Sequence, residues 1–110
     1  MILPGAERAV VDPAKIRDYL LSREHPIGRF KAQFFESLGY AQSDWTRLQA
    51  AQLDLVRSRD AAEGQASRFG RKYEVRGNLI GPSGRRADVV TVWVTLTGDD
   101  VPRFVTAYPG

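Results

Sequence analysis

Apolar residues recur at helical spacing in three stretches of the first half of the chain, and this pattern predicts three helices. The first covers residues 12–22 and begins at Asp12-Pro13, because Asp caps a helix N-terminus and Pro suits its first turn. The second covers residues 29–38 and carries two adjacent phenylalanines on its apolar side. The third covers residues 43–59 and gives way to a polar stretch, so residues 60–70 are predicted to be a connector.

From residue 71 onward apolar residues recur at every second position, which predicts strands. Residues 71–80, 85–96 and 103–108 form three such segments, separated by turns. Short turns join antiparallel neighbours, so we expect a meander of at least three strands, to which Val10-Val11 could add a short edge strand. The predicted fold class is therefore α+β, with three N-terminal helices packed on a small antiparallel β-sheet in one domain.

Hydroxyl and aromatic side chains alternate along the last two predicted strands. Thr91 and Trp93 lie two residues apart on one strand, and Thr106 and Tyr108 lie two apart on the next, on the same face as Phe104. An exposed surface of this kind can stack and hydrogen-bond with a single-stranded nucleic acid. The alternative interpretation is that Trp93 and Tyr108 form a cross-strand pair that only stabilises the sheet.

The composition narrows the possible functions. With 110 residues, 43% of them hydrophobic, the chain forms one globular domain, and no apolar run approaches the ~20 residues of a membrane-spanning helix. The N-terminus lacks the apolar core of a secretory signal, so we expect a cytoplasmic protein. There is no cysteine and only one histidine, which excludes disulfides and a cysteine- or histidine-based zinc site. We therefore expect no cofactor, and chemistry that is metal-free or uses a carboxylate-held ion.

Positive charge is concentrated in the second half of the chain. Residues 1–67 carry nine basic and nine acidic side chains, whereas residues 68–110 carry seven and four and supply the whole net charge of +3. Six of those seven cations lie between positions 68 and 86: Arg68, Arg71, Lys72, Arg76, Arg85 and Arg86. Such a segment is typical of a surface that faces nucleic acid, although an Arg-rich domain from a high-GC genome would show the same excess without functional meaning.

Two side chains near the second helix are candidates for proton transfer and anion binding. His25 is the sole histidine, and imidazole is the side chain best suited to proton transfer at neutral pH; alternatively, it is exposed or caps a helix. Lys31 lies three and four residues before Phe34 and Phe35, so it either covers their aromatic surface or directs its ammonium group into a cleft beside His25. The Gly- and Pro-rich residues 81–84 lack the spacing of a phosphate-binding loop and are predicted to form a turn.

Two stretches of the chain are specific enough to compare with known families: His25-Pro26-Ile27-Gly28 followed by Lys31-Ala32, and Pro102-Arg103-Phe104-Val105-Thr106-Ala107-Tyr108. With supporting stretches such as Asp18-Tyr19-Leu20-Leu21 and Lys72-Tyr73-Glu74-Val75, they span nearly the whole chain. In these residues the chain resembles an uncharacterised bacterial domain family that occurs at the C-terminal tips of polymorphic and contact-dependent toxins and as stand-alone proteins. Such toxin tips are similar, in overall shape, to the barnase/EndoU/colicin class of metal-independent RNases.

The resemblance implies a toxin-like ribonuclease that cleaves RNA through its 2′-hydroxyl group and is paired with an acidic antitoxin or immunity protein. We expect His25 to be the general base or acid, Lys31 and Arg103 to stabilise charge on the phosphorus, and Thr106 and Tyr108 to position the phosphate or donate a proton. The residues expected to bind the RNA are Trp93, Thr91, Arg71, Lys72, Arg76, Arg85 and Arg86. The alternative function is a non-catalytic nucleic-acid- or protein-binding module of the same fold.

Overall fold

The computed structural model describes residues 1–110 and has an α+β fold. In chain order its elements are η1 (Ala6–Arg8), α1 (Pro13–Lys15), η2 (Ile16–Leu20), α2 (Gly28–Ser37), η3 (Gln42–Asp44), α3 (Trp45–Ser58), β1 (Ala61–Ser67), β2 (Gly70–Ile80), β3 (Arg86–Leu96) and β4 (Arg103–Pro109). α1 and η2 form one continuous helical segment, in which η2 is wound as a π-helix. The Asp12 side chain caps this segment by accepting a hydrogen bond from Ala14 N–H at 2.9 Å.

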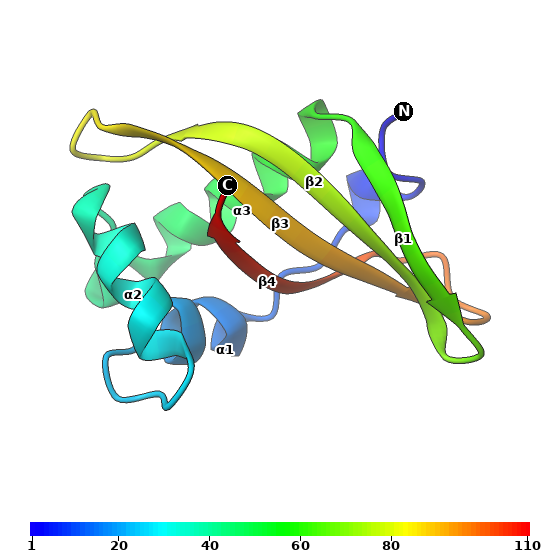
Figure 1. Ribbon diagram of the computed structural model, residues 1–110, viewed down its shortest axis with the longest axis horizontal. Helices are drawn as coiled ribbons and strands as arrows, with labels where there is room; N and C mark the ends of the chain where they lie inside the picture. The colour runs from blue at the N-terminus through cyan, green and yellow to red at the C-terminus, as the bar shows by residue number, and fades with distance from the viewer.

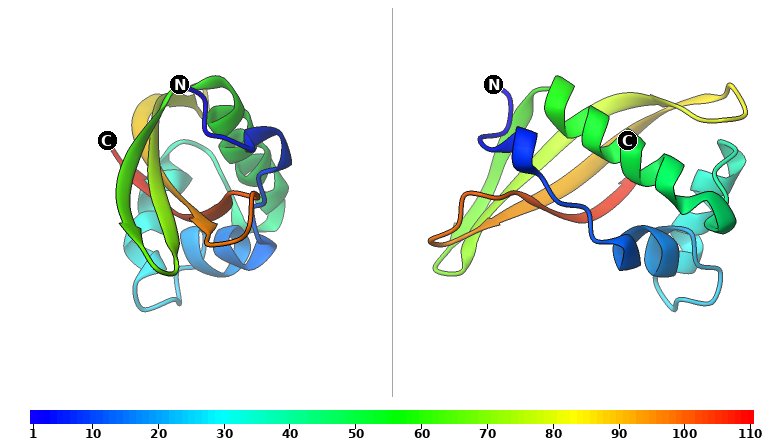
Figure 2. Two further views of the ribbon diagram at one scale, coloured as in Figure 1. Left: turned by 90° about the vertical axis from the view of Figure 1, so that its right-hand side faces the viewer. Right: turned by 180° about the vertical axis from the view of Figure 1, so that it is seen from behind.

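The four strands form one antiparallel sheet in the order β1-β2-β3-β4. α3 runs along one face of the sheet, and α1 and α2 lie beside β4 (Figures 1 and 2). The opposite face, which we call the outer face, has no helix across most of its area (Figure 2). Register and alternation place these side chains on the outer face: Lys72, Glu74 and Arg76 of β2, Val90, Val92, Val94 and Leu96 of β3, and Arg103, Thr106 and Tyr108 of β4.

The hydrophobic core lies between α3 and the inner face of the sheet. Leu48 of α3, Val75 of β2 and Trp93 of β3 are all completely buried, and burial of such apolar area is the main favourable contribution to folding. Gly77 allows α3 to approach β2 closely, because a Cβ atom at this position would lie 2.8 Å from the Leu55 side chain. No helix of the fold is both long enough and apolar enough to cross a membrane.

The predicted helices and strands are present, with two differences. Not all of the helices are N-terminal, since α3 continues to Ser58, past the middle of the chain. The connector predicted over residues 60–70 is wrong, because β1 occupies most of it and pairs with β2. Residues 62–67 are all exposed and β1 is held by its backbone, so its sequence has no alternation of apolar and polar residues that could reveal a strand.

The predicted edge strand at Val10-Val11 is reduced to a bridge at one residue. Val10 N–H donates to Pro102 C=O at 2.9 Å, and Val10 C=O accepts from Phe104 N–H at 2.9 Å. At the opposite edge of the sheet, β1 is flanked only at its start, where Ala61 N–H donates to Met1 C=O at 2.8 Å. The N-terminal segment therefore touches both edges of the sheet.

Candidate active site

Three side chains that are far apart in the sequence meet at the β4 edge of the sheet. The Lys31 ammonium group on α2 donates hydrogen bonds to Thr106 Oγ1 on β4 at 2.7 Å and to Tyr19 OH on η2 at 2.6 Å. The two hydroxyl oxygens are 3.1 Å apart. All three residues are half-buried. We call them the Lys31 cluster.

Gly28 allows α2 to bring Lys31 to this position. A Cβ atom at residue 28 would overlap the Tyr19 carbonyl group, so only glycine permits this approach of α2 to η2. Lys31 follows Gly28 by three residues, and positions three apart share a helix face. The other end of α2 is fixed to the β2–β3 turn, where Ser83 N–H and Ser83 Oγ donate to Leu38 C=O at 3.0 and 2.9 Å.

A β-bulge in β4 places Thr106 on the outer face. Val92 pairs with Thr106, whereas Trp93 pairs with Phe104, so Val105 is an extra residue in β4. The bulge shifts the alternation by one residue, and Phe104 therefore points into the core while Thr106 points away from it. The prediction that Phe104 and Thr106 share a face is wrong for this reason.

His25 lies next to the cluster, but its ring is engaged with the backbone. Its Nδ1 accepts hydrogen bonds from Ile27 N–H at 3.1 Å and Gly28 N–H at 2.9 Å, and so caps the N-terminus of α2. Because Nδ1 accepts both bonds, the neutral imidazole carries its proton on Nε2, which remains a donor. The ring also packs edge-on against Tyr19, with centroids 5.0 Å apart. His25 thus helps to hold both α2 and Tyr19 in place.

The surroundings of Tyr19 increase the acidity of its hydroxyl group. Burial raises the pKa of Tyr19, but hydrogen bonds with Lys31 and Thr106 and the positive charges of Lys31 and Lys15 together outweigh burial and lower the pKa below its ordinary value. The Lys31 and Lys15 ammonium groups lie 5.0 and 5.9 Å from the centre of the Tyr19 ring. A more acidic phenol releases its proton more readily, as a general acid must.

An open depression of about 600 Å³ lies beside the Lys31 cluster. Its lining includes Lys15, Tyr19, His25, Thr106, Asp12 and Asp18. Both carboxylates are already engaged, since Asp12 caps α1 and Asp18 accepts two hydrogen bonds from Arg17, each 2.9 Å long. The Lys15 ammonium group, the Tyr19 and Thr106 hydroxyl groups and the His25 imidazole of the lining can therefore bind an anion such as a phosphodiester.

Residues 2–110 match the model of a family described as a domain of unknown function, DUF6883. The chain belongs to this family. Among solved structures, the DUF6883 domain is similar to a contact-dependent growth inhibition toxin–immunity protein complex from Klebsiella pneumoniae 342, with a TM-score of 0.73 and 23% sequence identity. The similarity covers 93% of this chain and 100% of the matched chain and establishes a shared fold. No curated protein matches the domain in sequence.

The DUF6883 domain gathers several other predicted site residues on its outer face. Tyr108 lies in one cross-strand row with Arg76, and Arg103 lies in another with Lys72. Thr106 occupies the row between them. These side chains come from β2 and β4, which the intervening strand β3 brings onto one surface.

Trp93 and Thr91 are completely buried on the inner face and cannot contact a substrate there. Trp93 Nε1–H donates to Thr91 Oγ1 at 2.8 Å, and Thr91 Oγ1 donates to Val75 C=O at 2.8 Å. The Trp93 ring packs edge-on against Phe104, with centroids 5.3 Å apart. The predicted stacking surface is therefore part of the core, and the alternative pair of Trp93 with Tyr108 does not form either, because Tyr108 lies on the outer face.

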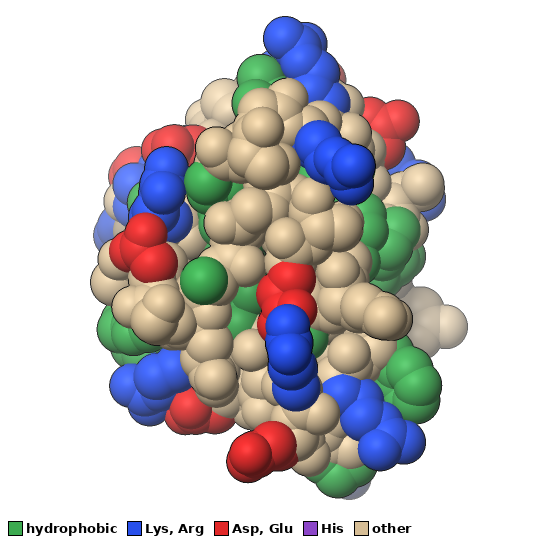
Figure 3. Space-filling model, turned by 90° about the vertical axis from the view of Figure 1, so that its left-hand side faces the viewer, with side chains coloured by type: hydrophobic (Ala, Val, Ile, Leu, Met, Phe, Trp, Pro, Cys, Tyr) green, Lys and Arg blue, Asp and Glu red, His purple; other side chains and the backbone are tan.

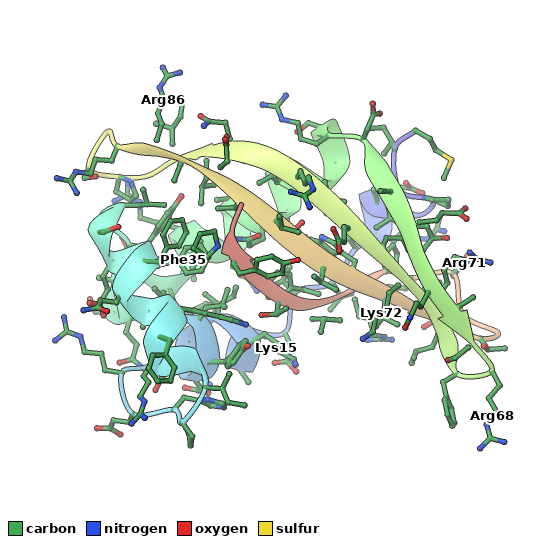
Figure 4. The ribbon with its side chains drawn as sticks, viewed as in Figure 1. Lys15, Phe35, Arg68, Arg71, Lys72 and Arg86 are labelled. Carbon is green, nitrogen blue, oxygen red and sulfur yellow. The ribbon has the colours of Figure 1, made fainter.

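The basic segment 68–86 does not form a single surface. Arg68, Arg71 and Lys72 lie at one end of the β2–β3 pair, and Arg85 and Arg86 lie at the other, as Figure 4 shows for four of these side chains. Arg71 also projects from the face opposite Lys72 and binds a glutamate of β1. At the α2 end of the DUF6883 domain, Lys and Arg side chains are interspersed with Asp and Glu (Figure 3). The sequence predicts one path of positive charge, and the fold divides it in two.

Sequence reasoning missed Tyr19, which the apolar pattern treats as one more core position of the first helix. A signal was nevertheless present. A tyrosine beside Ile16 and Leu20 on a buried helix face needs a polar partner for its hydroxyl group. Lys31 and Thr106 are the two partners that the fold supplies.

Proposed function

We propose that this DUF6883 domain is a toxin that cleaves RNA without a metal ion and is neutralised by an immunity protein. The Lys31 cluster carries the ribonuclease proposal, because its two hydroxyl residues line an open depression and its cation donates a hydrogen bond to each hydroxyl group. The fold shared with a protein of a toxin–immunity complex supports the toxin role. The net charge of +3 suits an acidic immunity protein that covers the depression and the outer face.

The proposed reaction is a transesterification in which RNA supplies its own nucleophile. The 2′-oxygen forms a bond to phosphorus while the bond from phosphorus to the 5′-oxygen breaks, which leaves a 2′,3′-cyclic phosphate. Lys31 and Thr106 bind the non-bridging oxygens and stabilise the charge that develops on them. Tyr19 donates its proton to the departing 5′-oxygen, and the proton of the 2′-hydroxyl group passes to water.

The remaining candidates hold the substrate in this scheme. His25 donates its Nε2–H to the phosphate, whereas the general-base role expected from the sequence would require Nδ1 to release the α2 cap. Arg103, half-exposed and 3.5 Å from Asp99, has guanidinium N–H groups free for a neighbouring phosphate. Tyr108 contacts the sugar or base of the adjoining nucleotide.

The proposal is tested by incubating total RNA with the purified domain in the presence of EDTA. We expect cleavage by the wild type, and a loss of about hundredfold or more in Lys31→Met, because the main charge on the phosphate is removed. Thr106→Val and Tyr19→Phe should each lose activity without losing a core side chain. Thermal unfolding of each variant checks that the fold is intact.

Lys15→Met is the matched control, because Lys15 is a second lysine close to the Tyr19 ring and lines the depression, but makes no hydrogen bond to Tyr19 or Thr106. Its loss of activity should be much smaller than that of Lys31→Met. A wild-type domain that degrades no RNA, or a Lys31→Met variant as active as the wild type, contradicts the proposal. Binding of RNA without cleavage would support the non-catalytic module instead.

A further inference from the structure

The turn between β1 and β2 holds a phenylalanine out in solvent on a well-fixed backbone. Phe69 is 68% exposed, and the Arg68 guanidinium lies 4.9 Å from the centre of its ring. Phe69 N–H donates to Ser67 Oγ at 3.1 Å, and Phe69 C=O accepts from Thr97 N–H at 2.9 Å. Thr97 Oγ1 also donates to Arg68 C=O at 2.8 Å. The exposed ring is therefore presented from a turn that is tied to the β3–β4 connection.

Phe69 borders a shallow hollow of about 290 Å³, which we call the Phe69 hollow. The residues that matter for its chemistry are Ser67, Phe69, Gly70, Lys72, Val94 and Leu96. Its lining combines an aromatic ring, an aliphatic surface and the Lys72 ammonium group, and it includes no acidic side chain. A ring that can stack beside a cation that can bind phosphate is the combination that single-stranded nucleic acids require. The volume is at the small end for ligand sites and suits one nucleotide.

The Phe69 hollow lies on the same face of the sheet as the Lys31 cluster. Val94 and Leu96 alternate with inward-pointing residues of β3 and so share the outer face with Val92, the strand partner of Thr106. Val92 and Leu96 are four residues apart, which is about 13 Å along a strand. An extended RNA segment of a few nucleotides covers this separation.

Two cations of the outer face lie in the cross-strand row next to the one that holds Thr106 and Glu74, and one of them, Lys72, also lines the hollow. Lys72 and Arg103 occupy one cross-strand row, on either side of Val94, so phosphates that cross this row meet a positive charge from each neighbouring strand. In Figure 4 the Lys72 and Arg68 side chains lie at the same end of the sheet, the latter beyond the β1–β2 turn. These cations are hydrogen-bond donors spaced along the strands, and a polynucleotide carries an acceptor phosphate at every nucleotide, so the arrangement favours a polynucleotide over an acidic protein.

We propose that the Phe69 hollow is a base-binding subsite for single-stranded RNA, in which Phe69 stacks on a base while Lys72 and Arg68 bind the adjoining phosphates. The subsite rests on the proposed ribonuclease function and extends it, because it gives a binding place to a segment of the RNA that lies away from the cleaved bond. Interactions with such a segment contribute to catalysis only when the substrate is long enough to reach them.

The test compares substrates of two lengths. The cleavage site of the wild type in total RNA is mapped first, and a dinucleotide and a longer oligonucleotide that contain this site are then synthesised. Phe69→Ala should lower kcat/KM for the longer substrate by about tenfold or more, the usual effect of removing a stacking ring, and leave the dinucleotide unchanged. Phe69→Trp should keep the preference for the longer substrate. Phe30→Ala is the matched control, because Phe30 is also exposed and lies under an arginine, but on α2.

Binding is measured separately with a 2′-O-methyl oligonucleotide, which lacks the attacking hydroxyl group, by fluorescence anisotropy. Weaker binding by Phe69→Ala supports the subsite even if the wild type cleaves nothing, in which case the ribonuclease proposal alone fails. Equal cleavage and equal binding by Phe69→Ala and the wild type overturn the subsite and leave the ribonuclease proposal intact. Phe69→Ala that binds RNA normally but loses affinity for an immunity protein would also overturn it, and would assign the hollow to a protein interface.

Discussion

The His25 imidazole accepts two backbone hydrogen bonds and packs against Tyr19, so a single substitution can change both the stability of α2 and the position of Tyr19. His25→Ala should lower the free energy of unfolding by about 1 kcal/mol, as expected for loss of a helix cap, and should reduce RNA cleavage as well. His25→Asn retains an acceptor that can cap α2 but cannot transfer protons. We expect it to recover most of the stability and to lose only the contribution of the Nε2–H bond to the phosphate from the activity, measured by urea unfolding and by RNA cleavage.

The opposite result would change the assignment of His25. A His25→Asn variant that is as stable as the wild type but inactive would show that the imidazole takes part in the reaction. The residue would then be the general acid or base that the sequence predicts.

Tyr19 predicts a pH dependence of cleavage. A general acid works only while it is protonated, so kcat/KM should fall as the pH rises through the pKa of Tyr19, which lies below the ordinary tyrosine value. Lys15→Met removes one of the charges that lower this pKa, and should move the fall in kcat/KM to higher pH. Tyr19→Phe should abolish it. A fall that persists in Tyr19→Phe would assign it to another group.

At the scale of elements, α3 carries a polar side chain in the core. Gln52 is completely buried, and neither its Nε2 nor its Oε1 has a hydrogen-bond partner. Gln52→Leu removes two unsatisfied polar atoms and keeps most of the volume, so the free energy of unfolding should rise by about 1–3 kcal/mol in urea titrations. Gln49→Leu is the control and should destabilise, because Gln49 Nε2 donates to Val11 C=O at 2.9 Å.

A Gln52→Leu variant that is less stable than the wild type would contradict this account. It would mean that the amide group of Gln52 makes favourable interactions in the folded protein. The comparison with Gln49→Leu controls for the effect that any glutamine-to-leucine substitution on α3 would have on stability.

The apolar spacing of the sequence predicts α2, α3 and three of the four strands, because these elements bury one side. It does not predict β1, whose side chains are almost all exposed. It also gives no sign of the bulge at Val105, which places Phe104 and Thr106 on opposite faces of the sheet. Both faces of β3 contain valines, so the apolar pattern does not show which face is buried. The buried face is the one that carries Trp93 and Thr91, whose side chains hydrogen-bond to each other.

Part of the candidate site was predictable as well. Lys31 and Thr106 are identified from residue type and position, and the structure joins them by a hydrogen bond. Their meeting could not be predicted, because it depends on how α2 packs against β4. Tyr19 was missed because a tyrosine at an apolar position has the same periodicity as a leucine.

At the scale of the whole molecule, the proposed chemistry lies where the helical layer meets one edge of the sheet. α1 and α2 lie beside β4, and the outer face extends from there to the β1–β2 turn (Figure 1). The Lys31 cluster and the Phe69 hollow therefore share one face of the sheet. Arg85 and Arg86 lie at the far end of β2 and β3, outside the region between the Lys31 cluster and the Phe69 hollow.

The distance in sequence between the members of the Lys31 cluster has a consequence for biosynthesis. Lys31 and Thr106 are 75 residues apart, and β4 leaves the ribosome after the other three strands of the sheet. Until then the ammonium group has no threonine to bind, and a nascent chain lacks the assembled centre. Under the proposed function, RNA cleavage can therefore begin only after β4 has been synthesised and has paired with β3.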